Sequence, residues 1–351
     1  MKQRIPVLAV LVSVYAAAVA AGYIAQVARL PLPWMIGPLV STALIGFIGN
    51  RAIPIPLRSR PFGQVTVAAQ VGLSFSPAAF GMLLERAPLI VGLAISTCVC
   101  AAFSAFVLSR MGRIPLASAM LATLPTSPVE AAIMAERHGI APGSIIFAQT
   151  LRIAGVVLIV PIAVYAVDGV PARSGVLPVD HSGLHTVLLF GIALLGAVGF
   201  RLLRISNPFF LGPLFTVACV TAVGIEIPAF PPPVLGAAQV VLGTWLGSNF
   251  QRDLFASAGR RTIAILCSGS LLILLCTGTA LLLALTLGLP WEDLVLGAAP
   301  GGVTEMALTA RYLEQNVALI TAFHLVRIFL IVPNIPWVVA RIHRFEHVRQ
   351  E

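Results

Sequence analysis

Two arginines inside apolar segments are the first candidates for chemistry in this sequence. Arg152 and Arg327 each stand in an apolar run that is long enough to cross a membrane. A cation at that depth costs about 2.5–3.5 kcal/mol on insertion scales, so it should face a bundle interior or a water-filled cavity and have a partner. Glu130 and Glu305 are the candidate partners. Such pairs could also serve only to hold the halves of the protein together, and the arginines could instead lie near the membrane surface and extend to it.

Each arginine follows an apolar helix that is interrupted by proline or glycine. The interruptions read Leu124-Pro-Thr-Ser-Pro-Val-Glu130 and Ala299-Pro-Gly-Gly-Val-Thr-Glu305. In the first, Ser127 has the position of an N-cap, Pro128 that of the first helical residue, and the glutamate that of the third residue of a capping box. The second interruption repeats this spacing. Both patterns predict a helix that stops and then restarts.

A restart at membrane depth presents free N–H groups and the positive end of a helix dipole to the bundle interior. Paired interruptions in two halves of a chain are typical of the binding site of a transporter. With the arginines they predict a positive pocket for a small anion such as a carboxylate, and a pair of proline kinks without a ligand is the alternative. The residues predicted to bind the substrate are Thr126, Ser127, Glu130, Gln149, Arg152, Gly301, Gly302, Thr304, Glu305, His324 and Arg327.

Gln149 and His324 precede their arginines by three residues, which puts each on the same helical face as its arginine. His324 could couple transport to protons, because imidazole titrates near neutral pH. A histidine that only donates a hydrogen bond is the alternative. The coupling ion would be H⁺ or Na⁺, and we expect no other cofactor.

The composition places these residues in a membrane protein. The chain has 351 residues, of which 58% are hydrophobic and 10% charged, and its mean hydropathy is +0.98. Apolar runs of roughly 18–25 residues, the length that crosses a bilayer as a helix, recur from end to end. The net charge of +9 comes from basic residues in the connections, which indicates topology rather than nucleic-acid binding. We expect segments at 5–28, 31–49, 61–83, 88–109, 115–136, 143–167, 183–203, 208–225, 232–250, 262–287, 290–311 and 316–340.

The chain also repeats itself at an offset of 175 positions. The motif Pro33-Trp-Met-Ile-Gly-Pro-Leu39 meets Pro208-Phe-Phe-Leu-Gly-Pro-Leu214, and charged and proline residues match in the same register. The sequence therefore predicts a first membrane repeat at 1–170, a linker at 171–182, a second repeat at 183–345 and a cytoplasmic tail at 346–351. Further matched pairs are Arg29 and Arg204, Arg86 and Arg261, Pro125 and Pro300, Glu130 and Glu305, and Arg152 and Arg327.

The basic residues of the two halves follow different segments, so equivalent connections should face opposite sides of the membrane. The repeats are then inverted, and each half needs an odd number of crossings, so one of its six segments should be re-entrant or broken. We expect an all-α helical bundle of about 10–12 membrane segments in the inner membrane, with both termini cytoplasmic. The residues behind this assignment are Lys2, Arg4, Arg51, Arg58, Arg60, Arg110 and Arg113 in the first half, and Arg201, Arg204, Arg252, Arg260 and Arg261 in the second.

No catalytic constellation appears in the sequence. The five cysteines lie in apolar runs without metal-ligand spacing, and the six histidines form no cluster that would hold the copper or iron of an oxygenase. A P-loop, a dinucleotide fingerprint and a Ser-His-Asp pattern are absent as well. We therefore expect no enzyme activity, and no soluble basic module is left over to bind DNA.

Through the Pro33–Leu39 and Pro208–Leu214 motifs and the two interruptions, the chain resembles the AbrB duplication family of bacterial membrane proteins over nearly its whole length. Members are labelled transporter, ammonia monooxygenase or regulator of gene expression, which implies an internally duplicated multi-spanning protein. We expect a secondary transporter that binds a small, anionic metabolite at the midplane between the repeats and alternates access to it. A membrane sensor that affects gene expression indirectly is the alternative, ahead of a membrane-bound oxygenase. The partners would be the lipid bilayer and the substrate, and a homo-oligomer is left open.

Overall fold

A computed structural model describes residues 7–49, 53, 55–169, 183–250 and 259–348. These residues form helices and, within those ranges, no strand. In these ranges five helices are long and apolar enough to cross a membrane, or up to seven if each of two bent pairs is one span. The predicted all-α polytopic fold with broken helices is confirmed. Some predictions concern residues outside the described ranges, namely Lys2, Arg4, Arg51, Arg252 and the linker 171–182.

Large apolar side chains are exposed on the long helices. Leu8 is 72% exposed, Leu195 75% and Leu285 83%. Soluble monomers rarely expose continuous apolar surface on this scale, whereas a lipid bilayer covers it without cost. The apolar helices therefore belong to a multi-pass membrane protein.

The chain folds into two compact units, and each unit takes matching pieces from both halves of the sequence. Unit 1 comprises Met1–Glu85, Pro161–Gln251 and Ala307–Leu319, and unit 2 comprises Arg86–Val160, Arg252–Met306 and Ile320–Glu351. Residues 1–85 and 176–260 correspond at the offset of 175, so the first part of each repeat lies in unit 1. The rest of each repeat forms most of unit 2. The compact units thus cut across the repeats rather than following them.

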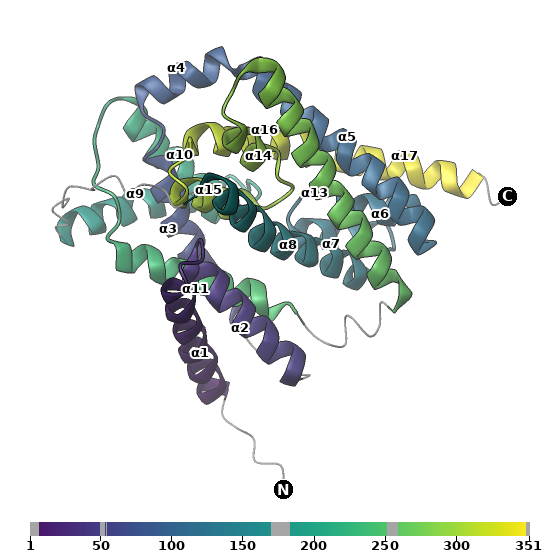
Figure 1. Cartoon of the computed structure of the whole chain (residues 1–351), viewed down its shortest axis with the longest axis horizontal. Helices are drawn as coiled ribbons and strands as arrows, with labels where there is room; N and C mark the ends of the chain where they lie inside the picture. Colours follow the sequence, from purple (N-terminus) through teal and green to yellow (C-terminus); the bar gives the residue numbers. More distant parts are fainter. Residues whose placement is uncertain (1–6, 50–52, 54, 170–182, 251–258, 349–351) are drawn as a thin grey trace, which may run out of the picture. The chain divides into compact units, whose positions relative to one another are not determined.

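The helices of unit 1 come from the first part of each repeat (Figure 1). Its elements are α1 (Val7–Val27), α2 (Pro33–Gly49), η1 (Leu57–Ser59), α3 (Arg60–Gly72), α4 (Pro77–Glu85), α9 (Gly183–Leu202), α10 (Pro208–Ala222) and α11 (Pro232–Ser248).

Glycines of the duplicated motif let two pairs of helices in unit 1 approach closely. A Cβ added to Gly37 of α2 would meet the backbone of Ala21 in α1 at 2.5 Å. At the offset of 175, a Cβ added to Gly212 of α10 would collide with the backbone of Gly196 in α9. The same helix contact is therefore built twice, from equivalent residues. Only glycine fits at these crossings, because a side chain would push the two backbones apart.

One contact in unit 1 joins positions that are equivalent in the two repeats. A Cβ on Gly63 in α3 would lie 2.9 Å from the carbonyl oxygen of Ala238 in α11. The two positions differ by 175, so each repeat offers a small residue to the other at the same position of the repeat. Helices α3 and α11 consequently pack around a local two-fold axis.

The predicted span 61–83 is wrong as a single helix. It consists of α3 and α4, which meet at an angle of 84°. Pro77 cannot donate a helical hydrogen bond, and the Ser76 hydroxyl accepts one from the Ala79 N–H group at 3.2 Å. The chain therefore restarts in a new direction at Ser76, which caps the second helix.

The helices of unit 2 come mainly from the later part of each repeat, and three further helices are divided between the units. Within unit 2 lie α5 (Ala87–Gly112), α6 (Leu116–Thr123), α7 (Pro128–Arg137), α13 (Arg260–Leu287), α14 (Trp291–Ala298) and α17 (Ile335–Val348). The divided helices are α8 (Pro142–Asp168), α15 (Val303–Tyr312) and α16 (Val317–Ile331).

The longest helices of unit 2, α5 and α13, are equivalent in the repeats and pack along one another (Figure 1). A Cβ on Gly112, at the end of α5, would lie 3.7 Å from the Cβ of Ala264, near the start of α13. The two helices therefore run antiparallel. Because both are long enough to span a membrane, equivalent helices cross it in opposite directions, as the inverted repeat predicts.

The predicted span 316–340 is also divided. Helix α16 ends at Ile331 and α17 begins at Ile335, with a bend of 47° between them. Pro333 and Pro336 lie at this bend, where a continuous helix would need their missing N–H groups. The last predicted segment is therefore a helix pair.

Candidate functional site

The two predicted interruptions are real breaks. Helix α6 ends at Thr123 and α7 begins at Pro128, while α14 ends at Ala298 and α15 begins at Val303. Ser127 has the extended backbone of an N-cap and Pro128 the first helical position, as predicted. The Ser127 side chain makes no capping hydrogen bond, so the capping-box prediction is wrong for that hydroxyl.

Arg152 and Gln149 of α8 bind the first break through its carbonyl oxygens. Arg152 donates from Nη1 to the Thr123 oxygen at 2.9 Å and from Nη2 to the Thr126 oxygen at 3.4 Å. The Gln149 amide donates to the oxygens of Leu121 at 2.7 Å and Leu124 at 2.9 Å. Its own oxygen accepts from Arg152 Nη2 at 2.7 Å, which joins the two side chains into one unit.

Arg327 and His324 of α16 bind the second break in the same manner. Arg327 donates to the oxygens of Ala299 and Gly301, both at 2.8 Å. His324 Nε2 lies 3.0 Å from the Leu296 oxygen, and because a carbonyl only accepts, this nitrogen carries the proton. Both side chains are fully buried.

The hydrogen bonds of the two breaks correspond at the offset of 175. Gln149 donates to Leu121 and His324 to Leu296, and the acceptors are equivalent positions. The acceptors of the second arginine bonds, Thr126 and Gly301, are equivalent too. The duplicated sequence therefore builds a similar network twice, in which histidine replaces glutamine and keeps the equivalent of the Leu121 acceptor, while Arg327 binds the equivalent of the second glutamine acceptor, Leu124.

Carbonyl oxygens hold the guanidinium groups where we expected Glu130 and Glu305. The acceptors lie in the last turn of α6 or in the breaks, where helix carbonyls lack helical donors and the dipole is negative. Glu305 instead folds back over its own N-cap position, since a Cβ on Gly302 would collide with its carboxylate. The sequence suggested carboxylates as the partners of the arginines because it does not show which main-chain carbonyl groups can accept hydrogen bonds.

The arginines thus bind the first half-helices, α6 and α14, at the negative ends of their dipoles. The positive ends of the second half-helices, α7 and α15, are not bound by the arginines. In α7 the first helical bond runs from the Ala131 N–H group to Ser127, and in α15 from Met306 to Gly302. The N–H groups before these donors have no helical acceptor. Thr126 and Thr304 are buried beside them, at 8% and 5% exposure. The site can therefore offer backbone and hydroxyl donors to an anion.

All of the predicted site residues lie in unit 2. The second break is close to α8, the helix that supports the first break, because a Cβ on Gly301 would lie 2.9 Å from a methyl group of Val156. The charges of Arg152 and Arg327 also act on each other. The half-buried residues are Ser127, Glu130, Gly302 and Glu305.

Sequence reasoning missed the residues whose carbonyls complete the network, Leu121, Thr123, Leu124, Leu296 and Ala299. Their position at the end of a helix before a proline was the available signal, because such carbonyls need outside donors. For metals, the described ranges hold no group of three or more His, Cys, Asp or Glu side chains that could act as ligands.

We expect His324→Gln to retain the wild-type thermal stability, because an amide donates to the equivalent carbonyl in the other repeat. His324→Leu should lose about 1–2 kcal/mol of stability, since it leaves the Leu296 oxygen without its donor. Thermal unfolding of the detergent-purified variants measures both effects. Equal losses in the two variants would show that this hydrogen bond is not what His324 contributes.

The fold and the paired breaks define a polytopic α-helical membrane protein with an inverted internal repeat. The chain belongs to the family whose model is described as "Transition state regulatory protein AbrB", which matches residues 2–126 and 34–343. The family predicted from the sequence motifs is confirmed.

Two relatives match along most of their lengths. The chain is 22% identical to "Uncharacterized protein YhjN" of Bacillus subtilis (strain 168) over 341 residues, covering 90% of this chain and 89% of the relative. It is 22% identical to "Putative regulator AbrB" of Escherichia coli (strain K12) over 312 residues, covering 86% of this chain and 88% of the relative. The similarity thus spans both repeats.

Proposed function

We propose that this protein is a secondary transporter that binds a small anion at the N-terminal ends of α7 and α15 and alternates access to it across the inner membrane. The substrate is translocated without chemical conversion, and a gradient of H⁺ or Na⁺ drives the cycle. Both termini lie in the cytoplasm. The two breaks contribute groups at equivalent positions of opposite repeats, and this pairing of broken helices, typical of transporters that alternate access about a midplane site, supports the proposal.

The observation that carries this proposal is a pair of buried guanidinium groups whose hydrogen-bond acceptors, in the part of the chain that the structure describes, are uncharged. Carbonyl and amide oxygens accept hydrogen bonds from the Nη atoms of Arg152 and Arg327 without neutralising their charges, and among the described residues the buried Nε of each arginine has no acceptor. Two such cations in one apolar unit raise its electrostatic potential, and the positive dipole ends of α7 and α15 add to it. A small anion is the ligand that this potential favours.

Binding is tested by thermal unfolding of the detergent-purified protein with succinate, methylphosphonate, ethanolamine or glycerol. A ligand that binds only the folded state raises the apparent melting temperature. We expect succinate or methylphosphonate to raise it, and ethanolamine and glycerol to leave it unchanged. Stabilisation by ethanolamine alone would contradict an anion site.

The site is tested by Thr304→Val, which removes a buried hydroxyl at the start of α15 and keeps the side-chain shape. We expect anion affinity to fall about tenfold, the effect of losing roughly 1.4 kcal/mol of hydrogen bonding to a charged ligand. Thr97→Val in α5 is the matched control, because that buried hydroxyl bonds the Leu93 oxygen of its own helix. Equal affinities of the two variants would place the anion elsewhere.

A membrane sensor is the second candidate, and the name of the Escherichia coli relative favours it. A sensor binds its ligand, whereas a transporter also moves it across a sealed membrane. Uptake of radiolabelled succinate or methylphosphonate into proteoliposomes, with an imposed H⁺ or Na⁺ gradient, separates the two. Gradient-dependent uptake supports the transporter, and binding without uptake supports the sensor.

A further inference from the structure

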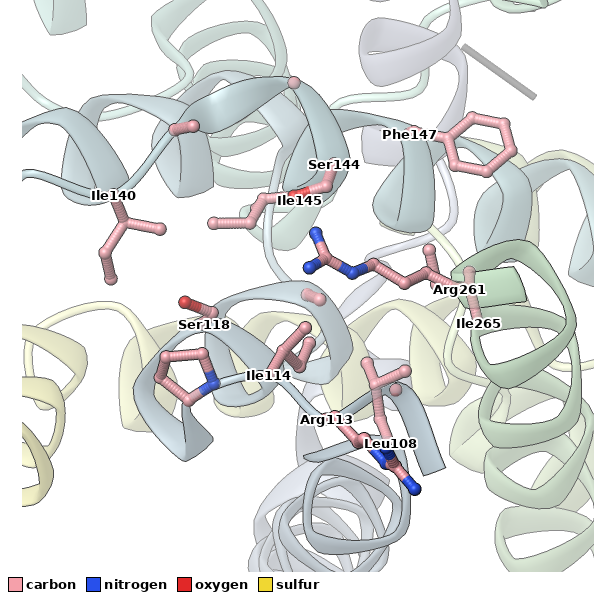
Figure 2. Close-up of a pocket in the computed structure, with 15 residues that line it drawn as sticks. Leu108, Arg113, Ile114, Ser118, Ile140, Ser144, Ile145, Phe147, Arg261 and Ile265 are labelled. Carbon is pink, nitrogen blue, oxygen red and sulfur yellow. The ribbon is translucent and has the colours of Figure 1, made fainter. Parts of the chain in front are cut away.

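A second feature of unit 2 is a cavity of about 350 Å³ where several helices begin or end. It lies between the end of α5, the start of α6, the start of α8 and the start of α13 (Figure 2). Ligand pockets in proteins have volumes of about 300–1,000 Å³, so the cavity can hold a small organic molecule. It is not one of the two breaks, although Ala122 in its wall precedes the first of them.

The polar groups that line the cavity are hydrogen-bond donors. Figure 2 shows the Arg261 guanidinium reaching from α13 into the space between Ser118 of α6 and Ser144 of α8. Among the described residues, these three side chains have no hydrogen-bond or ion-pair partner. The guanidinium of Arg113, also in the wall, is directed away from the serines. One cation and two hydroxyls thus converge without an internal acceptor.

Apart from Arg113, the other side chains of the wall are apolar. Ile114, Ile140, Ile145 and Ile265 surround the serines and the arginine. Helices α6 and α8 also begin at the cavity, so the positive ends of their dipoles add to the charge of the guanidinium. The wall therefore combines a site for one anionic group with a larger surface for hydrocarbon.

The two hydroxyls of the cavity are specific to the first repeat, whereas its cation, Arg261, belongs to the second repeat and is matched by Arg86. The residue equivalent to Ser118 is Asp293, and the residue equivalent to Ser144 is Leu319. The fold therefore accepts an acid at the first position, and it does not require two hydroxyls beside a cation. A requirement of folding alone would not produce this difference between repeats.

We propose that this cavity binds an amphiphile with one phosphate group, the phosphate held by Arg261, Ser118 and Ser144 and the apolar part packed on the isoleucines. Guanidinium groups bind phosphate through paired N–H donors, and serine hydroxyls supply further donors. Helices α5 and α13 are long enough to span the membrane, so the cavity at their ends lies at a membrane surface. The molecule is either an anionic lipid of that surface or a soluble alkyl phosphate. This site goes beyond the proposed transport function and does not depend on it.

The test measures binding of hexyl phosphate and dihexanoyl phosphatidic acid to the full chain in detergent by microscale thermophoresis. We expect both to bind, and dihexanoyl phosphatidylcholine, whose headgroup carries no net charge, to bind at least about tenfold more weakly. Equal binding of the phosphatidylcholine would overturn the proposal, because apolar packing alone would then account for it.

Two variants test the donors. We expect Arg261→Ala to weaken hexyl phosphate binding about tenfold or more, and Ser118→Asp, which introduces the acid found in the second repeat, to abolish it. Arg110→Ala is the matched control, since this arginine lies in the last turn of α5, whose end borders the cavity, but its guanidinium lies over the Phe106 ring at 5.1 Å and does not line the cavity. Unchanged affinity in both cavity variants would overturn the proposal, and their melting temperatures verify that they are folded.

The same binding measurement in nanodiscs distinguishes an anionic lipid from a soluble alkyl phosphate as the ligand. Membranes of phosphatidylcholine are compared with membranes that contain phosphatidic acid. If the lipid is the ligand, phosphatidic acid in the bilayer displaces hexyl phosphate, and Arg261→Ala removes the displacement. If a soluble molecule is the ligand, hexyl phosphate binds equally in both membranes and remains sensitive to Arg261→Ala.

Discussion

Replacing Arg327 with methionine is expected to destabilise the protein by roughly 3 kcal/mol or more. Methionine fills a similar volume but removes both donors to the second break, leaving the Ala299 and Gly301 oxygens buried without partners. Each hydrogen bond to a charged group contributes about 1.5–3 kcal/mol, and relief from burying the cation offsets part of the loss. Thermal unfolding of the detergent-purified variant measures the change.

Arg327→Lys separates the charge from the geometry. Lysine keeps the cation but cannot present the planar fork of donors that reaches two carbonyl oxygens at once. We therefore expect its melting temperature to lie between those of wild type and Arg327→Met, with Arg110→Ala as the surface control. A methionine variant as stable as wild type would show that the arginine does not position the break.

Gly212→Ala is expected to separate α9 from α10 and to destabilise unit 1 by about 1–3 kcal/mol, the usual cost of overpacking. The added Cβ would meet the carbonyl group of Gly196, which is backbone and cannot rotate away. Gly37→Ala should act similarly, because its Cβ would meet the backbone of Ala21. The apparent melting temperature and the monodispersity of the purified protein report the effect.

The control for these substitutions lies on the same helix. Gly199 of α9 has open space where a Cβ would be added. Because alanine is a better helix former than glycine by about 0.8–1.0 kcal/mol, we expect Gly199→Ala to be neutral or stabilising. A loss at Gly199 as large as at Gly212 would mean that the close approach of α9 and α10 is not what requires glycine at Gly212.

The sequence predicted the features that depend on local chemistry or on the repeat. Prolines and glycines marked both breaks, and the basic residues indicated the inversion now seen in antiparallel α5 and α13. The 84° bend before α4 was not predicted. Residues 73–76 contain only two serines between apolar helices, so the hydropathy of the sequence hardly changes there. The division into two units was also beyond the sequence, since it depends on which helices pack together rather than on which are consecutive.

In the candidate site, the helical faces of Gln149 with Arg152 and of His324 with Arg327 were predictable from their spacing. The acceptors of these side chains were not predictable. Every residue has a main-chain carbonyl group, and which of them lack a helical donor depends on where the helices end. The cavity beside Arg261 was unpredictable for a related reason. It is formed by the ends of four helices, of which α13 is distant in the chain from α5, α6 and α8, and no motif joins them.

The contact between Gly63 and Ala238 bears on how such a chain could arise. Its two positions are equivalent, so in a half-length ancestor they would be one residue, meeting itself across the axis of a homodimer. An isologous interface of that kind accepts only residues that can face their own copy. After gene fusion the two copies can diverge, and the present glycine and alanine are a small departure from identity. The replacement of glutamine by histidine in the duplicated network is a larger departure from identity. It could not have occurred in one subunit of a symmetric homodimer alone, because both subunits have the same sequence.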